Sequence, residues 1–299
     1  MPCCAAKPVR SRAPMPFEPA LQKMPRLERS DGALTLALVR DDAGITGIDD
    51  LYQRDPCRAL FPAPEPGDVF QAVMLTTSGG LAGGDRIAAS IAAGAGTRAL
   101  VTTQAAEKVY RARAENTLFS VEISVGAGAW LEWLPQETIL FDGARFRRET
   151  QITLAADARL LAAEIVVFGR AARGERLTAG HYLDRWRVER EGRIVWRDAV
   201  GWNGDPAAAL GHSAGFAGAG AMATVIYAGP GAVQHLVDAR AALEAVGSRA
   251  AATVVNGLLV ARFLADNAQI LRSDLAQLWC KLRAQAGNLP PVLPRTWYT

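Results

Sequence analysis

Ile91–Gln104 reads IAAGAGTRALVTTQ, and the same pattern returns 32 residues later in Ile123–Gln136, which reads ISVGAGAWLEWLPQ. The isoleucine, both glycines and the final glutamine fall in register between the two copies. A third, weaker copy begins at Ile152, where Ala155 and Asp157 take the places of the glycines. Each unit reads as a strand, a tight turn and a second strand.

The residues on either side of these turns are typical of β-strands. Leu118–Val125 and Arg159–Phe168 combine period-two alternation with β-branched and aromatic residues, and the Gly-x-Gly turns supply the positive φ that hairpins require. Stacked units of about 30 residues are a mark of repeat folds. We therefore predict a mainly β fold, with a β-helical or layered-sandwich body of stacked hairpin repeats. Chance similarity between glycine hairpins is the alternative explanation of the repeat.

Further strands are expected outside the repeat. Leu34–Arg40 and Val69–Thr77 look like strands separated by a proline-rich loop. Tyr182–Arg190 and Ile194–Val200 are predicted to pair as a hairpin across Glu191-Gly192.

Two helices are expected late in the chain, which predicts a small C-terminal α-β-α element. Val233–Val246 has apolar residues at helical spacing, and Asp266 can cap a second helix that ends near Gly287. Between them, Ala252–Leu264 contains an Asn256-Gly257 hairpin turn. The second helix carries one apolar stripe, formed by Leu271, Leu275, Leu278 and Leu282.

The composition predicts one folded domain behind a tail. Residues 1–26 are rich in proline without an apolar run, so we expect a flexible tail there rather than a secretory signal. Residues 27–299 are interpreted as a single domain, β-rich over 27–228 and α/β over 229–299.

Charge and cysteine content exclude several classes of protein. The 33 Lys and Arg against 30 Asp and Glu leave a net charge of +3 without a basic run, so nucleic acid is not an expected partner. The four cysteines lack the spacing of a zinc site or a disulfide scaffold, which indicates reduced thiols in a cytoplasmic protein. For Cys3-Cys4, metal binding is an alternative to a solvated pair. The cysteines are Cys3, Cys4, Cys57 and Cys280.

A stretch without charged residues, Pro206–Gln234, imitates a membrane span. Glycines interrupt it, and its larger apolar residues concentrate in Met222–Tyr227, far short of the roughly 20 residues a spanning helix needs. We expect a buried strand flanked by glycine loops, and no membrane partner.

Two motifs typical of enzymes lack their usual context. Gly211–Gly215 matches the nucleophile elbow G-x-S-x-G around Ser213, but no buried strand precedes it and no acid lies between Ser213 and His235. Gly94–Ala99 satisfies G-x-G-x-x-A, yet strand-like residues follow where a dinucleotide site needs a helix. The sequence contains no P-loop motif, and its histidines are widely spaced, so we expect no catalytic residues, no bound nucleotide and no fixed metal site. The histidines are His181, His212 and His235.

The carboxylates indicate a functional site more strongly than the histidines do. Glu132, Glu137 and Asp142 lie in one segment, and Asp85 ends the glycine run Gly79–Asp85. Opposed carboxylates suit glycoside hydrolysis, so a cytosolic β-helical hydrolase acting on a glycan-type substrate is the alternative function. Turn and strand-end acids paired with arginine are the structural interpretation.

Five blocks, in order, resemble the signature blocks of the UreD family of urease accessory proteins, also called UreH. The resemblance covers roughly residues 27–299, with one departure at Leu75–Ser78, where many members have a His-Pro-Pro-like sequence. The blocks are Gly79–Asp85, Thr102–Arg111, Leu131–Asp142, Phe168–Arg170 with Gly174-Glu175, and Pro294–Trp297. The matching motif residues are Gly79, Gly80, Gly84, Asp85, Thr103, Lys108, Tyr110, Arg111, Pro135, Glu137, Gly169, Arg170 and Glu175.

The resemblance implies a chaperone rather than an enzyme, required for assembly of the nickel metallocentre of urease. It implies a scaffold that binds apo-urease on one side and the accessory protein UreF on the other. UreF in turn recruits the GTPase UreG, which brings nickel, so GTP belongs to UreG and this chain binds no cofactor tightly. The resemblance is also compatible with a homodimer of the accessory complex. A plain oligomeric scaffold is a further class of function, to be distinguished from the chaperone.

Nickel in transit needs several weak polar sites rather than one deep site that would hold the ion. On the resemblance, Asp85, Glu137, Asp142 and Glu175 are candidate stations of a transient path. Turn capping and ion pairing remain the alternative for each of them.

Overall fold

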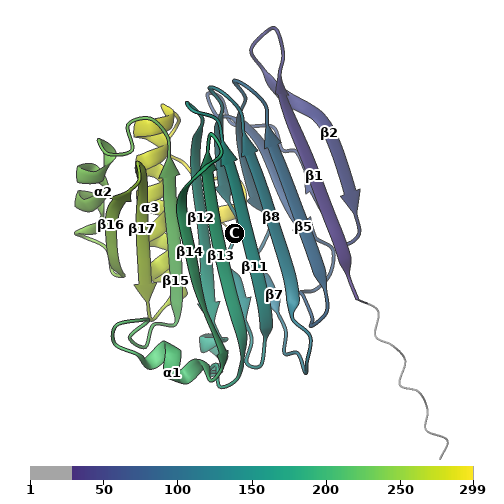
Figure 1. The fold of residues 1–299 in the computed structure, drawn as a ribbon, viewed down its shortest axis with the longest axis vertical. Coiled ribbons are helices and arrows are strands. Elements are labelled where there is room, and N and C mark those ends of the chain that lie inside the picture. Colours follow the sequence, from purple (N-terminus) through teal and green to yellow (C-terminus); the bar gives the residue numbers. More distant parts are fainter. Residues whose placement is uncertain (1–28, 299) are drawn as a thin grey trace, which may run out of the picture.

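The computed structural model describes residues 29–298, which form two stacked β-sheets with helices against one of them (Figure 1). The predicted tail, residues 1–26, lies outside the described residues, as do Cys3 and Cys4. Strand makes up 49 % of the structure and helix 15 %, which confirms the mainly β fold.

The two sheets differ in extent. Sheet A has seven strands, in the spatial order β14 (Arg193–Gly204), β13 (Gly180–Arg190), β11 (Arg145–Leu154), β8 (Thr117–Val125), β5 (Arg86–Ala93), β1 (Asp31–Arg40) and β2 (Thr46–Arg54). Sheet B has ten strands. Eight follow the order β16 (Arg249–Val255), β17 (Leu258–Ala265), β15 (Ala221–Ala228), β12 (Arg159–Phe168), β9 (Trp130–Leu134), β6 (Arg98–Thr103), β4 (Phe70–Thr76) and β3 (Cys57–Leu60). The short β10 (Thr138–Leu140) pairs with β12, and β7 (Glu107–Val109) pairs with β10.

Each sequence repeat crosses from one sheet to the other. β5, β8 and β11 are parallel neighbours in sheet A, and the strands that follow them, β6, β9 and β12, are parallel neighbours in sheet B. The repeats therefore stack as the coils of a β-helix, as predicted, but the prediction that their turns close hairpins is wrong. β9 is buried at all five positions, because sheet A covers one face and the helices cover the other.

The glycine turns stack on one another at one end of the coils. Gly96 and Gly128 have φ of +67° and +66°, the left-handed region that glycine adopts without strain. A Cβ atom on Gly126 would lie 2.9 Å from the backbone nitrogen of Ala95 in the coil before it, so only glycine allows this approach. In the third copy, the Asp157 carboxylate accepts a hydrogen bond of 2.9 Å from the Gly128 N–H.

The main core lies between the sheets. Alternate residues of sheet A strands point inward, as Leu34, Leu36 and Ile91 do, and pack against Val101 and Trp133 of sheet B. A second core fills the space between sheet B and α3 (Ala268–Gly287). α2 (His235–Leu243) packs beside β16 and α3, on the same side of sheet B (Figure 1).

The second half of the chain forms the predicted hairpins. β13 and β14 pair antiparallel across Glu191-Gly192, and β16 and β17 pair across Asn256-Gly257. β15 is the expected buried strand of the charge-free stretch, and it pairs with β12 and β17. No helix of the described residues is long and apolar enough to span a membrane.

The helix predictions need three corrections. A short helix, α1 (Pro206–Gly211), lies where only strand and loop were expected, and the Asp205 carboxylate caps it. α3 is capped by Asn267, whose side chain accepts from two backbone N–H groups, and not by Asp266. α2 is shorter than predicted, since it ends at Leu243. The predicted apolar stripe of α3 is buried as expected.

Two strands were missed in the proline-rich segment before residue 69. β2 and β3 occupy it, and β2 forms one edge of sheet A beside β1. Two single turns of 3-10 helix, η1 (Ala171–Arg173) and η2 (Arg295–Tyr298), complete the elements of residues 29–298.

Candidate functional site

Four of the five signature blocks meet at one end of the molecule. β4, β6, β9 and β12 run parallel in sheet B, so the loops that follow them all leave from the same end. Those loops carry the glycine run after β4, the segment before β7, the segment before β10 and the turn after β12. We name these four loops the motif end. The fifth block lies in and around η2, and Gln136 of the motif end donates a 2.6 Å hydrogen bond to the Thr296 carbonyl there.

The glycine run passes close to the loop beside it. The Tyr110 hydroxyl donates to the Gly79 carbonyl at 2.5 Å. A Cβ atom on Gly80 would lie 2.8 Å from the Lys108 carbonyl and the Tyr110 ring, and its φ of +143° also favours glycine. Gly79, Gly80, Lys108 and Tyr110 therefore form one packed corner of the motif end.

Asp85 is buried and bound by backbone. One carboxylate oxygen accepts from the Ser30 N–H at 2.8 Å, and the other accepts from the Ala82 N–H at 2.7 Å. These bonds hold the glycine run against the start of β1.

Asp142 and Glu175 lie next to each other, as part of one turn network. Glu175 accepts from the Asp142 N–H at 2.5 Å and pairs with Arg170. Burial opposes ionisation of Asp142, but hydrogen bonds from Thr178 and Ala179, with the charge of Arg111, hold its pKa below the usual value.

Glu137 is apart from that network and faces α3. Arg272 donates to Glu137 at 2.7 Å, and its guanidinium carbon lies 4.1 Å from the centre of the Trp297 ring. Of the four predicted stations, only Asp142 and Glu175 are in contact, and each of the four has a protein partner. Within residues 29–298, no three His, Cys, Asp or Glu side chains are arranged to hold a metal ion.

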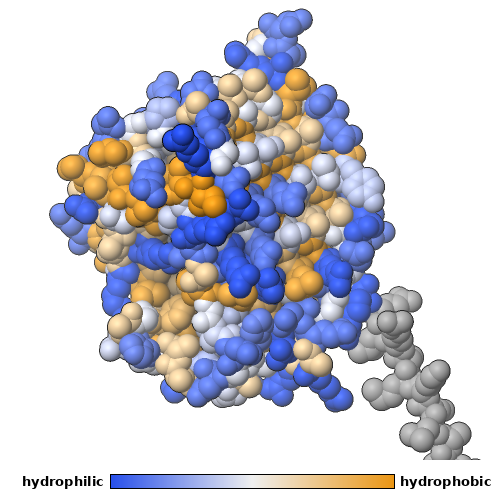
Figure 2. Space-filling view, viewed as in Figure 1, coloured by the Kyte–Doolittle hydropathy of each residue, from blue (hydrophilic) through white to orange (hydrophobic). Residues whose placement is uncertain are grey.

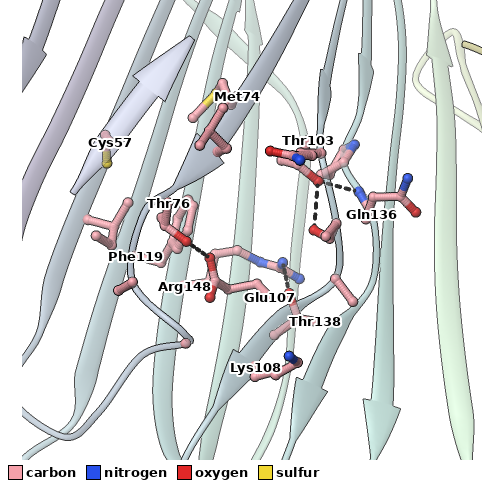
Figure 3. Close-up of a pocket in the computed structure, with 18 of the residues that line it drawn as sticks. Cys57, Met74, Thr76, Thr103, Glu107, Lys108, Phe119, Gln136, Thr138 and Arg148 are labelled. Atoms are coloured by element: carbon pink, nitrogen blue, oxygen red, sulfur yellow. Dashed lines mark hydrogen bonds between the residues drawn. The ribbon is translucent and has the colours of Figure 1, made fainter. Parts of the chain in front are cut away.

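A cavity of about 190 Å³ opens beneath the motif end, between the two sheets (Figure 3). Its mouth is formed by Ser78–Gly80 and Gln104–Lys108, and its depth reaches Arg148 of sheet A and Glu164 of sheet B. Thr103 and Pro135 of the motif residues also line it. Residues of three signature blocks, Gly79–Asp85, Thr102–Arg111 and Leu131–Asp142, thus line one opening into the space between the sheets.

Glu107 is the acid nearest the mouth. Its carboxylate accepts from the Thr76 hydroxyl at 3.1 Å, and the two side chains point toward each other in Figure 3. Burial raises the pKa of Glu107 to about 7, against the hydrogen bond from Thr76 and the charge of Lys108, which favour ionisation. Glu107 therefore changes its charge near neutral pH.

A buried ion cluster forms the inner wall of the cavity. Arg148 donates to Asp184 at 2.6 Å and to Glu164 at 2.5 Å, and so joins sheet A to sheet B. Burial alone would lower the pKa of Arg148, but the two carboxylates raise it above its usual value. Burial raises the pKa of Glu164, although the Arg148 charge opposes this. This wall of the cavity therefore holds two carboxylates against a single cation.

The cavity offers oxygen donors rather than strong metal ligands. Cys57 lines it, but burial raises the pKa of its thiol to about 11, so the thiol is neutral at neutral pH and a poor ligand. The sequence did not single out Glu107 or Glu164, and it indicated only a reduced thiol at Cys57. For Glu164, a charge inside the otherwise apolar strand Arg159–Phe168 was the available indication.

The enzyme-like motifs lie elsewhere. Ser213 follows α1 in an exposed turn and has no buried strand before it, as the sequence indicated. The Nδ1 atom of His212 accepts a local hydrogen bond of 3.2 Å from the Ala214 N–H. Gly94–Ala99 is the first coil turn, followed by β6 and not by a helix.

Residues 30–298 match the family described as UreD urease accessory protein. A protein of Magnetococcus marinus named urease accessory protein UreD is 43 % identical over 294 residues, which cover 97 % of this chain and 99 % of that protein. Urease accessory protein UreD 3 of a Bradyrhizobium species is 43 % identical over 87 % of this chain and 90 % of its own length. A Rhodopseudomonas palustris UreD protein is 41 % identical, over 90 % and 91 % respectively.

Proposed function

The chain belongs to the UreD family of urease accessory proteins, and from this premise we propose that it is a scaffold of urease maturation, which binds apo-urease and the accessory protein UreF. It is an accessory protein and not an enzyme, so the glycan hydrolase alternative is set aside. In this proposal UreF recruits the GTPase UreG, and the assembly delivers nickel to the urease metallocentre in the cytoplasm.

One observation carries the proposal: residues of three signature blocks line one cavity between the sheets, and the fourth block lies at the same end of the molecule. The blocks are far apart in sequence, and the parallel coils bring them to one end. Partner proteins can bind a surface built in this way, and the cavity behind it has polar residues in its lining.

Nickel is the cargo in this proposal, and its path consists of weak polar sites. Ni²⁺ accepts carboxylate and water, and weak successive sites allow it to leave again. Asp85, Glu137, Asp142 and Glu175 are the first candidates, although each has a protein partner. Glu107 joins them, because it lines the cavity and changes charge near neutral pH.

The test replaces each acid by its amide in a reconstituted activation of apo-urease. The amide keeps the size of the side chain and removes the charge. For a relay residue we expect the complex with apo-urease and UreF to be recovered as for the wild type, while the nickel content of urease falls. Glu122→Gln, on the exposed face of sheet A, is the matched control and should load nickel normally.

Three outcomes would contradict parts of the proposal. Normal nickel loading in all five variants would end the relay, and loss of soluble complex in all five would assign these acids a structural role. Failure of the wild-type chain to bind both apo-urease and UreF would overturn the scaffold itself.

A further inference from the structure

The edges of the two sheets are protected to different degrees. An edge strand offers unpaired N–H and C=O groups to any other strand unless charges, a bulge or another element blocks it. The β2 edge carries Asp49, Asp50 and Arg54. The β16 edge is approached by α2, from which Arg240 donates to the Ala252 carbonyl at 3.1 Å.

The β14 edge is different. Sheet B continues beyond β12 with β15, β17 and β16, whereas sheet A ends with β13 and β14. Among the described strands, β13 alone pairs with β14. The first half of β14 carries Arg193, Arg197 and Asp198, but the stretch Ala199–Gly201 carries no charge. β14 packs on β15 and β17 of sheet B, and its outer edge is left without a strand partner.

A groove of about 550 Å³ lies along this stretch, between β14 and the strands β15, β17 and β16. Its lining is mostly apolar, from Met222 and Leu264, and several lining residues are small, namely Ala199, Gly201 and Ala251. Figure 2 shows an apolar area over β15 and β17, bordered by hydrophilic side chains. Small residues around a hollow leave room for a large side chain that the chain itself does not supply.

Two polar contacts lie in this region. Arg249, which lines the groove, donates to the Phe216 carbonyl at 3.1 Å. Beyond the groove residues, Asn256 donates to the Val195 carbonyl of β14 at 2.9 Å. The lining stretch of β14 is a few residues of strand, at about 3.3 Å per residue.

The charged side chains that line the groove are arginines. Arg262 is paired with Asp198 of β14. Arg249 is half exposed, and its ion pair with Asp266 spans 4.0 Å to a carboxylate that is itself 89 % exposed. The Nη2 atom of Arg249 also donates to the Phe216 and Ala217 carbonyls. A carboxylate from outside can pair with the exposed remainder of the guanidinium, where it competes only with the weak, solvated pair to Asp266.

We propose that this groove, bounded by the free edge of β14 and the floor of β15, β17 and β16, receives an extended segment of a partner protein. The segment pairs its backbone with β14, inserts one large apolar side chain among Ala199, Gly201 and Ala251, and places an acidic residue at Arg249. Strand addition supplies affinity through main-chain hydrogen bonds, and the pocket supplies specificity. The inference rests on the proposed function in one respect, that the partner belongs to the urease maturation assembly.

The test fills the groove. Ala251→Trp places a large side chain in it from an exposed position, and Ala241→Trp, on the exposed face of α2, is the matched control. We expect Ala251→Trp to weaken binding of purified UreF or of purified apo-urease by about tenfold or more, since the anchor of a small interface carries most of its affinity. The control should bind both proteins as the wild type does, and both variants should unfold at the wild-type denaturant midpoint.

A photoreactive benzoylphenylalanine at position 251 identifies the occupant in the reconstituted assembly. The expected product is a cross-link to an extended segment of UreF or apo-urease that contains a large apolar residue and an acid. Cross-links to a second copy of this chain, or to its own residues 1–28, would overturn the inference. Unchanged binding of Ala251→Trp to both proteins would do the same. If the wild type binds neither protein, it is the proposed function that fails.

Discussion

Arg283 of α3 and Glu132 of β9 face each other in the interior, with the Arg283 Nε atom 2.9 Å from each carboxylate oxygen of Glu132 and neither side chain exposed. The same guanidinium pairs with Asp68 and donates to the Pro290 carbonyl at 2.7 Å. Trp279 donates to Glu132 from α3 as well, at 3.1 Å. One buried cation thus joins sheet B, the long helix and the segment that follows it.

Arg283→Met should therefore destabilise the chain strongly. It leaves two buried carboxylates without their cation, at a cost of about 3–5 kcal/mol in the free energy of unfolding. Denaturant unfolding followed by circular dichroism measures the loss. Arg295→Met, which removes an exposed pair with Glu65, should change the free energy of unfolding by less than about 0.5 kcal/mol. Equal effects of the two substitutions would contradict the role given to Arg283.

Glu107 makes the stability of the chain depend on pH. Its pKa is about 7 in the folded protein and near 4.5 when unfolded, so between these values the folded state binds more protons. Stability therefore falls as the pH rises through this window, by at most about 3 kcal/mol. Glu107→Gln should match the wild type at pH 4.5 and be more stable above pH 7. The check is urea unfolding across this range, with Glu122→Gln as a control that keeps the wild-type slope. If the free energy of unfolding of Glu107→Gln depends on pH as that of the wild type does, Glu107 is not the cause of the pH dependence.

The stacked turns predict a sharp contrast between two glycines. Gly126→Ala should cost about 1–3 kcal/mol, because its Cβ atom meets the backbone of the preceding turn, which has little room to move. Gly47→Ala should be neutral or slightly stabilising, since no atom lies within 4 Å of the added Cβ. Thermal unfolding measures the stability of the two variants. If Gly126→Ala is as stable as the wild type, the turns do not need glycine at this close approach.

Asp142 has the opposite pH dependence to Glu107. Its pKa is lowered in the folded protein, so its contribution is present above the ordinary pKa of an aspartate and is lost as the pH falls through the folded value. Asp142→Asn should cost about 1 kcal/mol at pH 7, and the difference from the wild type should narrow below about pH 4. Asp49→Asn, on the exposed β2 edge, is the control. A difference that stays constant with pH would mean that the charge of Asp142 does not matter.

Much of the fold could be read from the sequence, but the pairing of its repeats could not. Alternation and Gly-x-Gly turns look the same whether the two strands pair with each other or with the neighbouring repeat. The distinguishing feature was burial on both faces, visible in the apolar run around Trp130 and Trp133, which suits a parallel sheet better than a hairpin. The missed helix α1 also had its indication, in Asp205 followed by Pro206.

The motif residues of the candidate site could be predicted from the sequence, but the buried residues of the cavity could not. The signature blocks identified residues of the motif end, because each block is a short continuous stretch of sequence that can be recognised without the fold. Glu107 lies in one of these blocks, but only its partner Thr76, 31 residues away, and its burial distinguish it from an ordinary surface acid. Arg148 and Asp184 sit on strands of sheet A that carry many other charges, so their inward orientation becomes clear only with the register.

The parallel coils also make the two ends of the molecule different, which is useful for placing a label. The glycine turns and the motif end lie at opposite ends of the sheet B strands, roughly 20 Å or more apart for strands of this length. Ala127 is exposed in the second of these turns. A fluorophore attached there would follow the tumbling of the whole assembly as components join it, while leaving every signature block open to its partner.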